Sequence, residues 1–180
     1  MPHRTFIALD VNDSARRRLA AVRESVQVGR GGKINWVAPQ NLHVTMKFLG
    51  DVNDGLLADV CNAVRKACAD IPVFDFVLRG LRAIPPSGRV LRMFWAEVDE
   101  PTGQISELFA ALEDALEPLG FPREHHPFAP HITLARVKYT KNAAGLRAAV
   151  EPLAQENFGE VHAEYVTVYT SELTKSGPLY

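Results

Sequence analysis

The sequence predicts an α+β protein with antiparallel sheet that is internally duplicated into two lobes. Two short stretches resemble each other: each has histidine, an aliphatic residue, threonine and another apolar residue, starting at His43 and at His131, 88 positions apart. Predicted strands and helices alternate, and the order strand, helix, His-Thr strand, helix, strand occurs before Arg89 and again after it. A repeated order of elements indicates duplication, and strand pairs packed with helices are typical of the α+β class.

The elements of the first half follow from hydrophobic spacing and from residues that begin or end regular structure. The polar residues Asn12 to Ser14 can cap a helix, and the arginines after them are expected on its solvated face. The glycine-rich segment 29–33 predicts a turn and lacks the Walker spacing of a nucleotide-triphosphate site. We expect strands at 5–10, 34–37, 42–49 and 73–82, and helices at 15–26 and 54–69.

The second half is expected to repeat this order. Apolar residues at helical spacing follow Pro101, a favourable first helical position, and a proline-rich loop then leads to the second His-Thr strand. We expect strands at 89–98, 131–137 and 161–173, helices at 101–116 and 142–153, and a loop at 174–180.

Composition limits the classes of function. The chain has 180 residues, enough for a single domain spanning 1–180 with two lobes, and 47% of them are hydrophobic. Lys and Arg total 20 against 21 Asp and Glu, which excludes a strongly basic nucleic-acid coat but leaves room for a local basic pocket.

The cysteines and the N-terminal sequence predict a compartment. Cys61 and Cys68 fall two helical turns apart, too far for a disulfide, and are expected to be reduced thiols packed in the core. A reducing cytoplasm fits this pattern. We see neither a signal peptide nor an apolar run of membrane-spanning length, and we expect a cytoplasmic monomer without membrane contact.

The two motifs predict a polar site on an apolar backing. Side chains alternate along a strand, so His43 and Thr45 share one face, as do His131 and Thr133. The intervening aliphatic residues then point into the core. Two imidazoles that converge on one substrate would follow from such a pair.

With their flanking residues, these motifs resemble the 2H phosphoesterase superfamily. The matching pieces are Asn41 to Thr45 with Phe48 to Gly50, and Pro127 to Leu134 with Arg136; the beginning and end of the chain are also similar to the RNA 2′,3′-cyclic phosphodiesterases, or 2′-5′ RNA ligases, of that superfamily. The resemblance implies a bilobal, pseudo-twofold fold with two antiparallel sheets facing a central cleft, helices packed outside, and both termini in one lobe.

The resemblance also implies a reaction and its residues. It implies hydrolysis of a nucleoside or RNA 2′,3′-cyclic phosphate to the 2′-phosphomonoester without metal or other cofactor, with His43 as general acid and His131 as general base. Pseudo-symmetry prevents the residues alone from ordering these two roles. Thr45 and Thr133 would hydrogen-bond the phosphate oxygens. A tRNA fragment with a cyclic end would be one substrate, and the reverse reaction would be 2′-5′ ligation.

Two cationic residues are candidate phosphate ligands. Lys47 shares the strand parity of His43, so it is expected to line the cleft. Arg136 matches a family position, but on a regular strand it would face away from His131, so its role requires a bulge or a strand end. Among aromatic residues, Trp36, Phe48 and Phe128 are either base-stacking or core residues, and parity places Phe48 toward the core.

Other polar residues are not assigned to the phosphate site. His125 and His126 lack cysteine or carboxylate partners at zinc spacing, so no metal site is expected. Asp10 and Glu97 are interpreted as strand-end charges. Two alternatives stay open: a cyclic phosphodiesterase acting on a small ADP-ribose cyclic phosphate, and a non-catalytic module that binds nucleotide or RNA.

Overall fold

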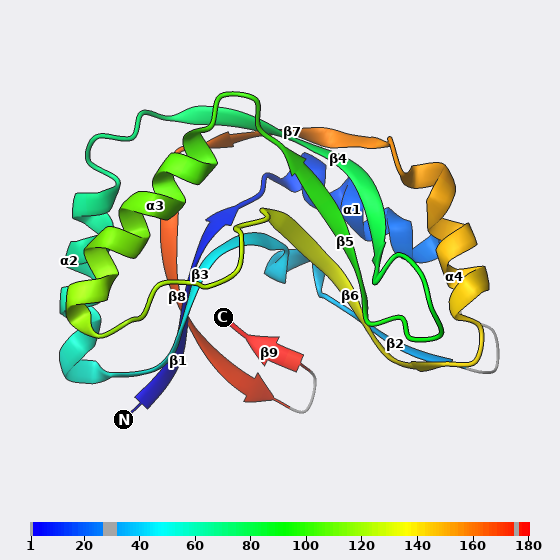
Figure 1. Ribbon diagram of the computed structural model, residues 1–180, viewed down its shortest axis with the longest axis horizontal. Coiled ribbons are helices and arrows are strands. Elements are labelled where there is room, and N and C mark those ends of the chain that lie inside the picture. The colour runs from blue at the N-terminus through cyan, green and yellow to red at the C-terminus, as the bar shows by residue number, and fades with distance from the viewer. Residues whose placement is uncertain (1, 27–31, 175–176) are drawn as a thin grey trace.

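The computed structural model describes residues 2–26, 32–174 and 177–180. Its strands form one curved antiparallel sheet in the order β7-β4-β5-β6-β3-β1-β8-β9, with β2 also paired to β6 (Figure 1). The strands are β1 (Pro2–Asp10), β2 (Gly32–Trp36), β3 (His43–Asn53), β4 (Phe74–Ile84), β5 (Met93–Asp99), β6 (His131–Thr140), β7 (Asn157–Ala163), β8 (Val166–Thr174) and β9 (Gly177–Leu179).

The sheet consists of two halves joined at a narrow contact. One half contains β3, β1, β8 and β9, and the other contains β6, β5, β4, β7 and β2. Between β3 and β6 the register pairs Val44 with Ile132. Each half begins at this contact with the strand that carries a His-Thr motif, and three further strands follow outward on each side. The predicted duplicated α+β fold is confirmed, and the two sheets are continuous rather than separate. The first and last described strands lie in the same half.

Each half of the sheet is covered by one helix from each half of the sequence. The helices are α1 (Asp13–Ser25), α2 (Asp54–Ala67), α3 (Gln104–Leu116) and α4 (Ala143–Val150), with short 3₁₀ turns η1 (Pro39–Asn41), η2 (Glu117–Leu119) and η3 (Glu151–Leu153). α2 and α3 pack on each other and contact β3, whereas α1 contacts β7 and α4 contacts β4 (Figure 1). Helices from both halves of the sequence therefore cover each half of the sheet.

Local sequence explains the helix positions. The side chain of Asn12 accepts a hydrogen bond from the backbone N–H of Ala15, which satisfies a donor at the start of α1. Ala15, Leu19 and Val22 are buried at helical spacing. Arg17, in the predicted arginine face, is exposed.

Several predicted boundaries were wrong. The strand expected at 161–173 is two strands, β7 and β8, because the chain leaves one half of the sheet and enters the other between them. Part of the expected C-terminal loop is strand β9, which pairs with β8. β5 begins at Met93 rather than at 89, and α3 begins at Gln104 after Gly103. Gly32 and Lys33 of the predicted turn begin β2, and its residues 29–31 lie outside the described residues.

The cysteine prediction was half right. Both thiols are free, but Cys61 is exposed and only Cys68 is partly buried against the core. The inner face of α2 buries Val60 and Val64 instead.

Two β-bulges at equivalent positions shape the motif strands. The register of β1 with β3 steps from Ala8↔Thr45 to Ile7↔Lys47, which leaves Met46 as an extra residue. The register of β5 with β6 steps in the same way past Leu134. A bulge resets the alternation of side chains. The pattern of burial shows this effect. In both His43–Phe48 and His131–Arg136, the fourth and fifth residues are buried in succession and the sixth is exposed.

Candidate active site

The register of β3 and β6 brings the two motifs together. Val44 and Ile132 are direct partners and both are fully buried, so the residues that flank them lie on the opposite face of the sheet. On that face, which we call the site face, the antiparallel register sets His43 beside Thr133 and Thr45 beside His131. The two histidines are then diagonal neighbours, a relation in which side chains start about 7–8 Å apart. All four side chains are partly exposed.

Both imidazoles are held by backbone carbonyls two residues earlier. His43 Nδ1 lies 2.7 Å from the carbonyl oxygen of Asn41, and His131 Nδ1 lies 2.8 Å from that of Ala129. A carbonyl oxygen only accepts, so each Nδ1 is the donor and carries the hydrogen. Each Nε2 is therefore the nitrogen that can gain or lose a proton in a reaction.

The His43 ring lies in an aromatic cluster. Its centroid is 4.8 Å from that of Phe6 and 5.5 Å from that of Tyr180, and Phe6 stacks on Tyr169 at 5.2 Å. His43 Nε2 lies 3.1 Å from the Thr45 hydroxyl oxygen. Burial lowers the pKa of His43, while the Asn41 carbonyl and the charge of Asp10 oppose that shift.

The His131 ring packs on Trp95 of β5, with ring centroids 4.1 Å apart. Burial lowers the pKa of His131, the Ala129 carbonyl raises it, and the positive charge of Arg136 lowers it further. The two histidines thus differ in the sign of their neighbouring charge: an anion acts on His43 and a cation acts on His131.

A carboxylate stands opposite each histidine on the outer strand. The registers pair Asp10 with His43 and Glu97 with His131. Asp10 accepts hydrogen bonds from Tyr169 at 2.6 Å and from Thr167 at 2.8 Å. Burial and the bond to Asp10 raise the pKa of Tyr169 to about 12.

Glu97 instead pairs with Arg82 at 2.9 Å. Asp10 and Glu97 were interpreted from the sequence as strand-end charges, and the equivalence of their positions opposite the two histidines was missed. A spacing signal was present, because Asp10 precedes His43 by 33 residues and Glu97 precedes His131 by 34.

The predicted role of Lys47 in the cleft is wrong. The bulge at Met46 turns Lys47 into the interior, where its ammonium group pairs with Glu113 of α3 and donates to the Pro122 carbonyl at 2.8 Å. The same bulge turns Phe48 outward, contrary to its parity, so that 66% of it is exposed. Its ring centroid lies 6.0 Å from that of Phe6 on the site face.

Arg136 reaches the site face because of the second bulge. Leu134 and Ala135 are both buried, and Arg136 then returns to the side of His131 and Thr133. Arg136 occupies in β6 the position that Phe48 occupies in β3, five residues after the histidine in each strand.

The other aromatic candidates belong to the interior. Trp36 stacks near Phe94, which is fully buried, and Phe128 stacks on Phe109 of α3 with centroids 4.1 Å apart. Sequence reasoning did not single out Trp95. Its relation to His131 depends on the pairing of β5 with β6.

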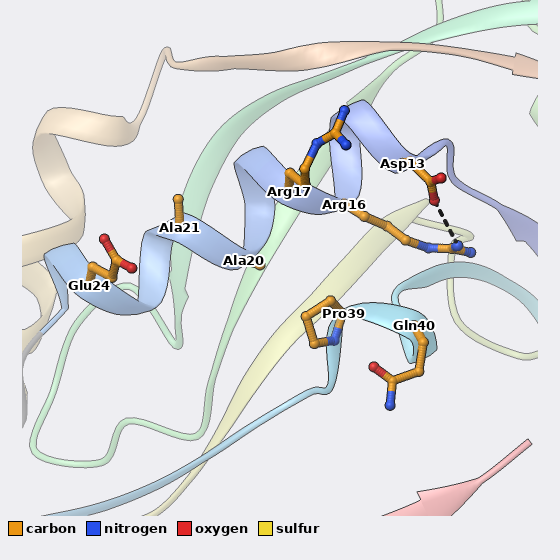
Figure 2. A pocket seen from close by; sticks show the side chains of 8 residues that line it. All are labelled: Asp13, Arg16, Arg17, Ala20, Ala21, Glu24, Pro39 and Gln40. Carbon is orange, nitrogen blue, oxygen red and sulfur yellow. Dashed lines mark ion pairs between the residues drawn. The ribbon is translucent and has the colours of Figure 1, made fainter.

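The features outside the site face concern metal binding, membrane-spanning helices and a surface hollow. Within residues 2–26, 32–174 and 177–180, no group of three or more His, Cys, Asp or Glu could hold a metal ion. None of the helices described is both long and apolar enough to cross a membrane. A surface hollow of about 540 Å³ lies between α1 and η1 (Figure 2). In it Arg16 pairs with Asp13 at 3.5 Å, and Arg17, Glu24, Pro39 and Gln40 also line it.

The sequence matches the profile of the 2′-5′ RNA ligase superfamily over residues 6–171. The chain belongs to this superfamily. Its membership confirms the resemblance to 2H phosphoesterases that the two motifs indicated.

Curated superfamily members align along nearly their whole length. A protein of Methanothermobacter thermautotrophicus, named RNA 2′,3′-cyclic phosphodiesterase, is 31% identical over 100% of this chain and 96% of its own. A protein of Archaeoglobus fulgidus with the same name is 33% identical, over 98% of this chain and 96% of its own.

Solved structures share the fold. A protein of Thermus thermophilus superposes with a TM-score of 0.80 at 28% identity, covering 98% of this chain and 93% of its own. LigT of Escherichia coli, solved with 3′-AMP, also gives a TM-score of 0.80, at 24% identity over 100% of this chain and 94% of its own.

Proposed function

We propose that this protein is a metal-independent phosphodiesterase that opens the 2′,3′-cyclic phosphate at the end of an RNA or nucleoside to give the 2′-phosphomonoester. The observation that carries the proposal is the pairing of the two His-Thr motifs across β3 and β6 with both Nε2 atoms left for proton transfer. The names of the curated relatives supply the substrate class.

The reaction requires two proton transfers on opposite sides of phosphorus. A water oxygen forms a bond to phosphorus and gives a proton to one imidazole, while the bond from phosphorus to the ribose 3′ oxygen breaks and that oxygen takes a proton from the other imidazole. Thr45 and Thr133 would donate hydrogen bonds to the phosphate oxygens where charge accumulates. Arg136 would add a charged donor at the same oxygens.

The charges beside the two rings favour one order of roles. Burial lowers the pKa of His43, but the Asn41 carbonyl and the charge of Asp10 oppose this shift and favour the protonated form, which suits the acid that delivers a proton to the 3′ oxygen. Burial and then Arg136 favour the neutral form of His131, which suits the base that accepts a proton from water. This order agrees with the roles implied by the family resemblance and rests on residues outside the motifs.

Ligation to a 2′-5′ bond would be the same opening of the cyclic phosphate with a 5′-hydroxyl in place of water as the nucleophile: its oxygen would bond to phosphorus while the bond to the ribose 3′ oxygen breaks. Hydrolysis is favoured in dilute solution because water is abundant and a second RNA end is not. Net joining would require two ends held next to each other.

The deciding experiment uses 2′,3′-cyclic AMP in the presence of a chelator, with identification of the product isomer. We expect turnover to the 2′-monophosphate at an unchanged rate with the chelator. Replacement of His43 or His131 by alanine should reduce turnover by about 10²–10⁴-fold, the usual contribution of acid–base catalysis.

The matched control is His126→Ala, because His126 is exposed and lies in the loop before the second motif. Its activity should equal that of the unaltered protein. Full turnover by a folded His43→Ala variant, or formation of the 3′-monophosphate, would contradict the proposal. An ADP-ribose cyclic phosphate in the same assay tests the alternative substrate.

A further inference from the structure

We propose that the RNA strand leading to the cyclic phosphate lies along a basic strip of β2 and β6, formed by Lys33, Lys138 and Tyr139 and continuous with Arg136 at the active site. The inference deepens the proposed function: it states where the remainder of the substrate binds once its terminal phosphate is between the histidines. The proposed ligand of the strip is single-stranded RNA, because a mononucleotide would end before the strip.

Charge is segregated along the sequence that forms this surface. Between Glu24 and Asp51 the sequence contains no acidic residue, and the same holds between Glu124 and Glu151. These segments supply β2 and the whole of β6, whereas the chain as a whole has a net charge of −1. A local excess of positive charge on a neutral protein is the electrostatic basis for binding an RNA backbone.

The strip lies on the site face. Asn35 pairs with Arg136 in the β2–β6 register, and Lys33 pairs with Tyr139 after a further bulge. Direct partners in an antiparallel pair project to the same face. Lys33 lies two positions before Asn35 on β2 and therefore shares its face, so Lys33 and Tyr139 are on the face of Arg136. Lys138 is the extra residue of this bulge and is exposed. The alternate residues Ile34 and Val137 pack against the core, which fixes the orientation.

The strip continues directly from the catalytic residues. β6 begins at His131. Beyond the short stretch in which β6 pairs with β3, it pairs with β2 (Figure 1). From His131 to Tyr139 the strand rises about 26 Å at roughly 3.3 Å per residue, so the surface extends well beyond one nucleotide. One strand therefore carries both the reacting centre and its basic extension.

Tyr139 adds a stacking surface among the cations. It is 61% exposed, whereas Trp36 on the neighbouring strand β2 packs against the core. Exposed aromatic rings between basic residues bind single-stranded nucleic acid because every base can stack on them without regard to sequence. A 2′,3′-cyclic phosphate lies at the 3′ end of an RNA, so the strand on this surface runs toward its 5′ side.

The test compares two substrates with one enzyme: 2′,3′-cyclic AMP and a ten-nucleotide RNA that ends in a 2′,3′-cyclic phosphate. In a Lys33→Glu/Lys138→Glu variant we expect kcat/KM for the RNA to fall by about tenfold or more at low salt, because two attractive interactions with phosphate become repulsive. The value for the mononucleotide should change by less than about twofold, because that substrate ends before the strip.

A second measurement isolates binding. In a Lys33→Gln/Lys138→Gln variant, the slope of log affinity for the product RNA against log salt should become shallower by about 0.7 for each phosphate that the protein no longer neutralises. Tyr139→Ala should weaken RNA binding with an unchanged salt slope, because stacking releases no counterions.

Two controls each reverse one charge elsewhere: Lys66→Glu at an exposed position of α2, and Arg17→Glu at the hollow beside α1. Neither should discriminate between the substrates. Equal loss on both substrates in the strip variant, no loss on either, or a selective loss of RNA activity with Arg17→Glu would overturn the proposal. Absence of turnover of both the mononucleotide and the RNA in the unaltered protein would instead refute the proposed function, and the binding measurement would still test the strip.

Discussion

Two histidines with the same backbone anchor differ in the charge that faces them. A carbonyl two residues earlier fixes the tautomer of each ring, so both Nε2 atoms start as equivalent groups. Asp10 and Arg136 then bias them in opposite directions. In the proposed mechanism, the symmetry of the fold would supply two proton-transfer groups, and the asymmetry of a few neighbouring residues would give them separate tasks.

This asymmetry predicts the pH dependence of activity. With His131 as base and His43 as acid, kcat/KM rises as His131 loses its proton and falls as His43 loses its proton. Because burial lowers the pKa of both free-enzyme groups, we expect the optimum of kcat/KM for 2′,3′-cyclic AMP to lie below the ordinary histidine pKa of 6.5. A pH profile with an optimum near 8 would contradict this expectation.

Two substitutions separate the roles. Arg136→Gln removes a cation that lowers the pKa of His131, so the acid limb of the profile should move to higher pH. Asp10→Asn removes an anion that raises the pKa of His43, so the alkaline limb should move to lower pH. If His43 were the base and His131 the acid, each substitution would move the other limb.

Among the elements, the bulges in β3 and β6 decide which side chains reach the site face. Each inserts one residue after the His-x-Thr triplet, so the residue five positions after the histidine returns to the site face. In β6 that residue is Arg136 and in β3 it is Phe48. The residue before it faces the interior, which is why Lys47 is buried with Glu113.

The ion pair of Lys47 and Glu113 connects β3, α3 and the loop that leads to His131. Glu113 also accepts a hydrogen bond from the backbone N–H of Glu124 at 2.6 Å, and Lys47 donates to the Pro122 carbonyl at 2.8 Å. Since both side chains are almost fully buried, removal of one partner leaves an unpaired interior charge.

We expect Glu113→Ala or Lys47→Ala to lower the free energy of unfolding by about 3–5 kcal/mol. The double variant Lys47→Met/Glu113→Leu should lose much less, because no charge is then left unpaired. Urea unfolding of the four proteins provides the comparison. Additive losses in the double variant would indicate that the two residues act independently.

At the scale of the molecule, the exchange of helices couples the two halves. α2 from the first half of the sequence packs on α3 from the second, and α1 crosses to β7. A half of the sheet without the other half of the chain would expose apolar faces of its own helices. The protein should therefore fold as one unit rather than as two lobes.

Cooperative unfolding is the measurable consequence. Both tryptophans, Trp36 and Trp95, lie in the β6 half of the sheet, so tryptophan fluorescence reports on that half alone. Far-UV circular dichroism reports on the whole molecule. We expect the two signals to give one coincident transition in urea. Separate midpoints would show that the lobes unfold independently.

The sequence by itself determined the duplicated α+β architecture and the two motifs, because hydrophobic periodicity and strand alternation act over a few residues. It correctly set His43 with Thr45, and His131 with Thr133, since two positions along an unbroken strand return to the same face.

Only the tertiary structure decided which residues accompany them. The bulges reset alternation after each triplet, so parity was misleading for Lys47 and Phe48 and placed Arg136 correctly only if a bulge was assumed. The opposition of Asp10 to His43 and of Glu97 to His131 arises from pairing between strands more than thirty residues apart. Local sequence does not encode such registers, because they depend on how all the strands of the sheet pair and pack over the core.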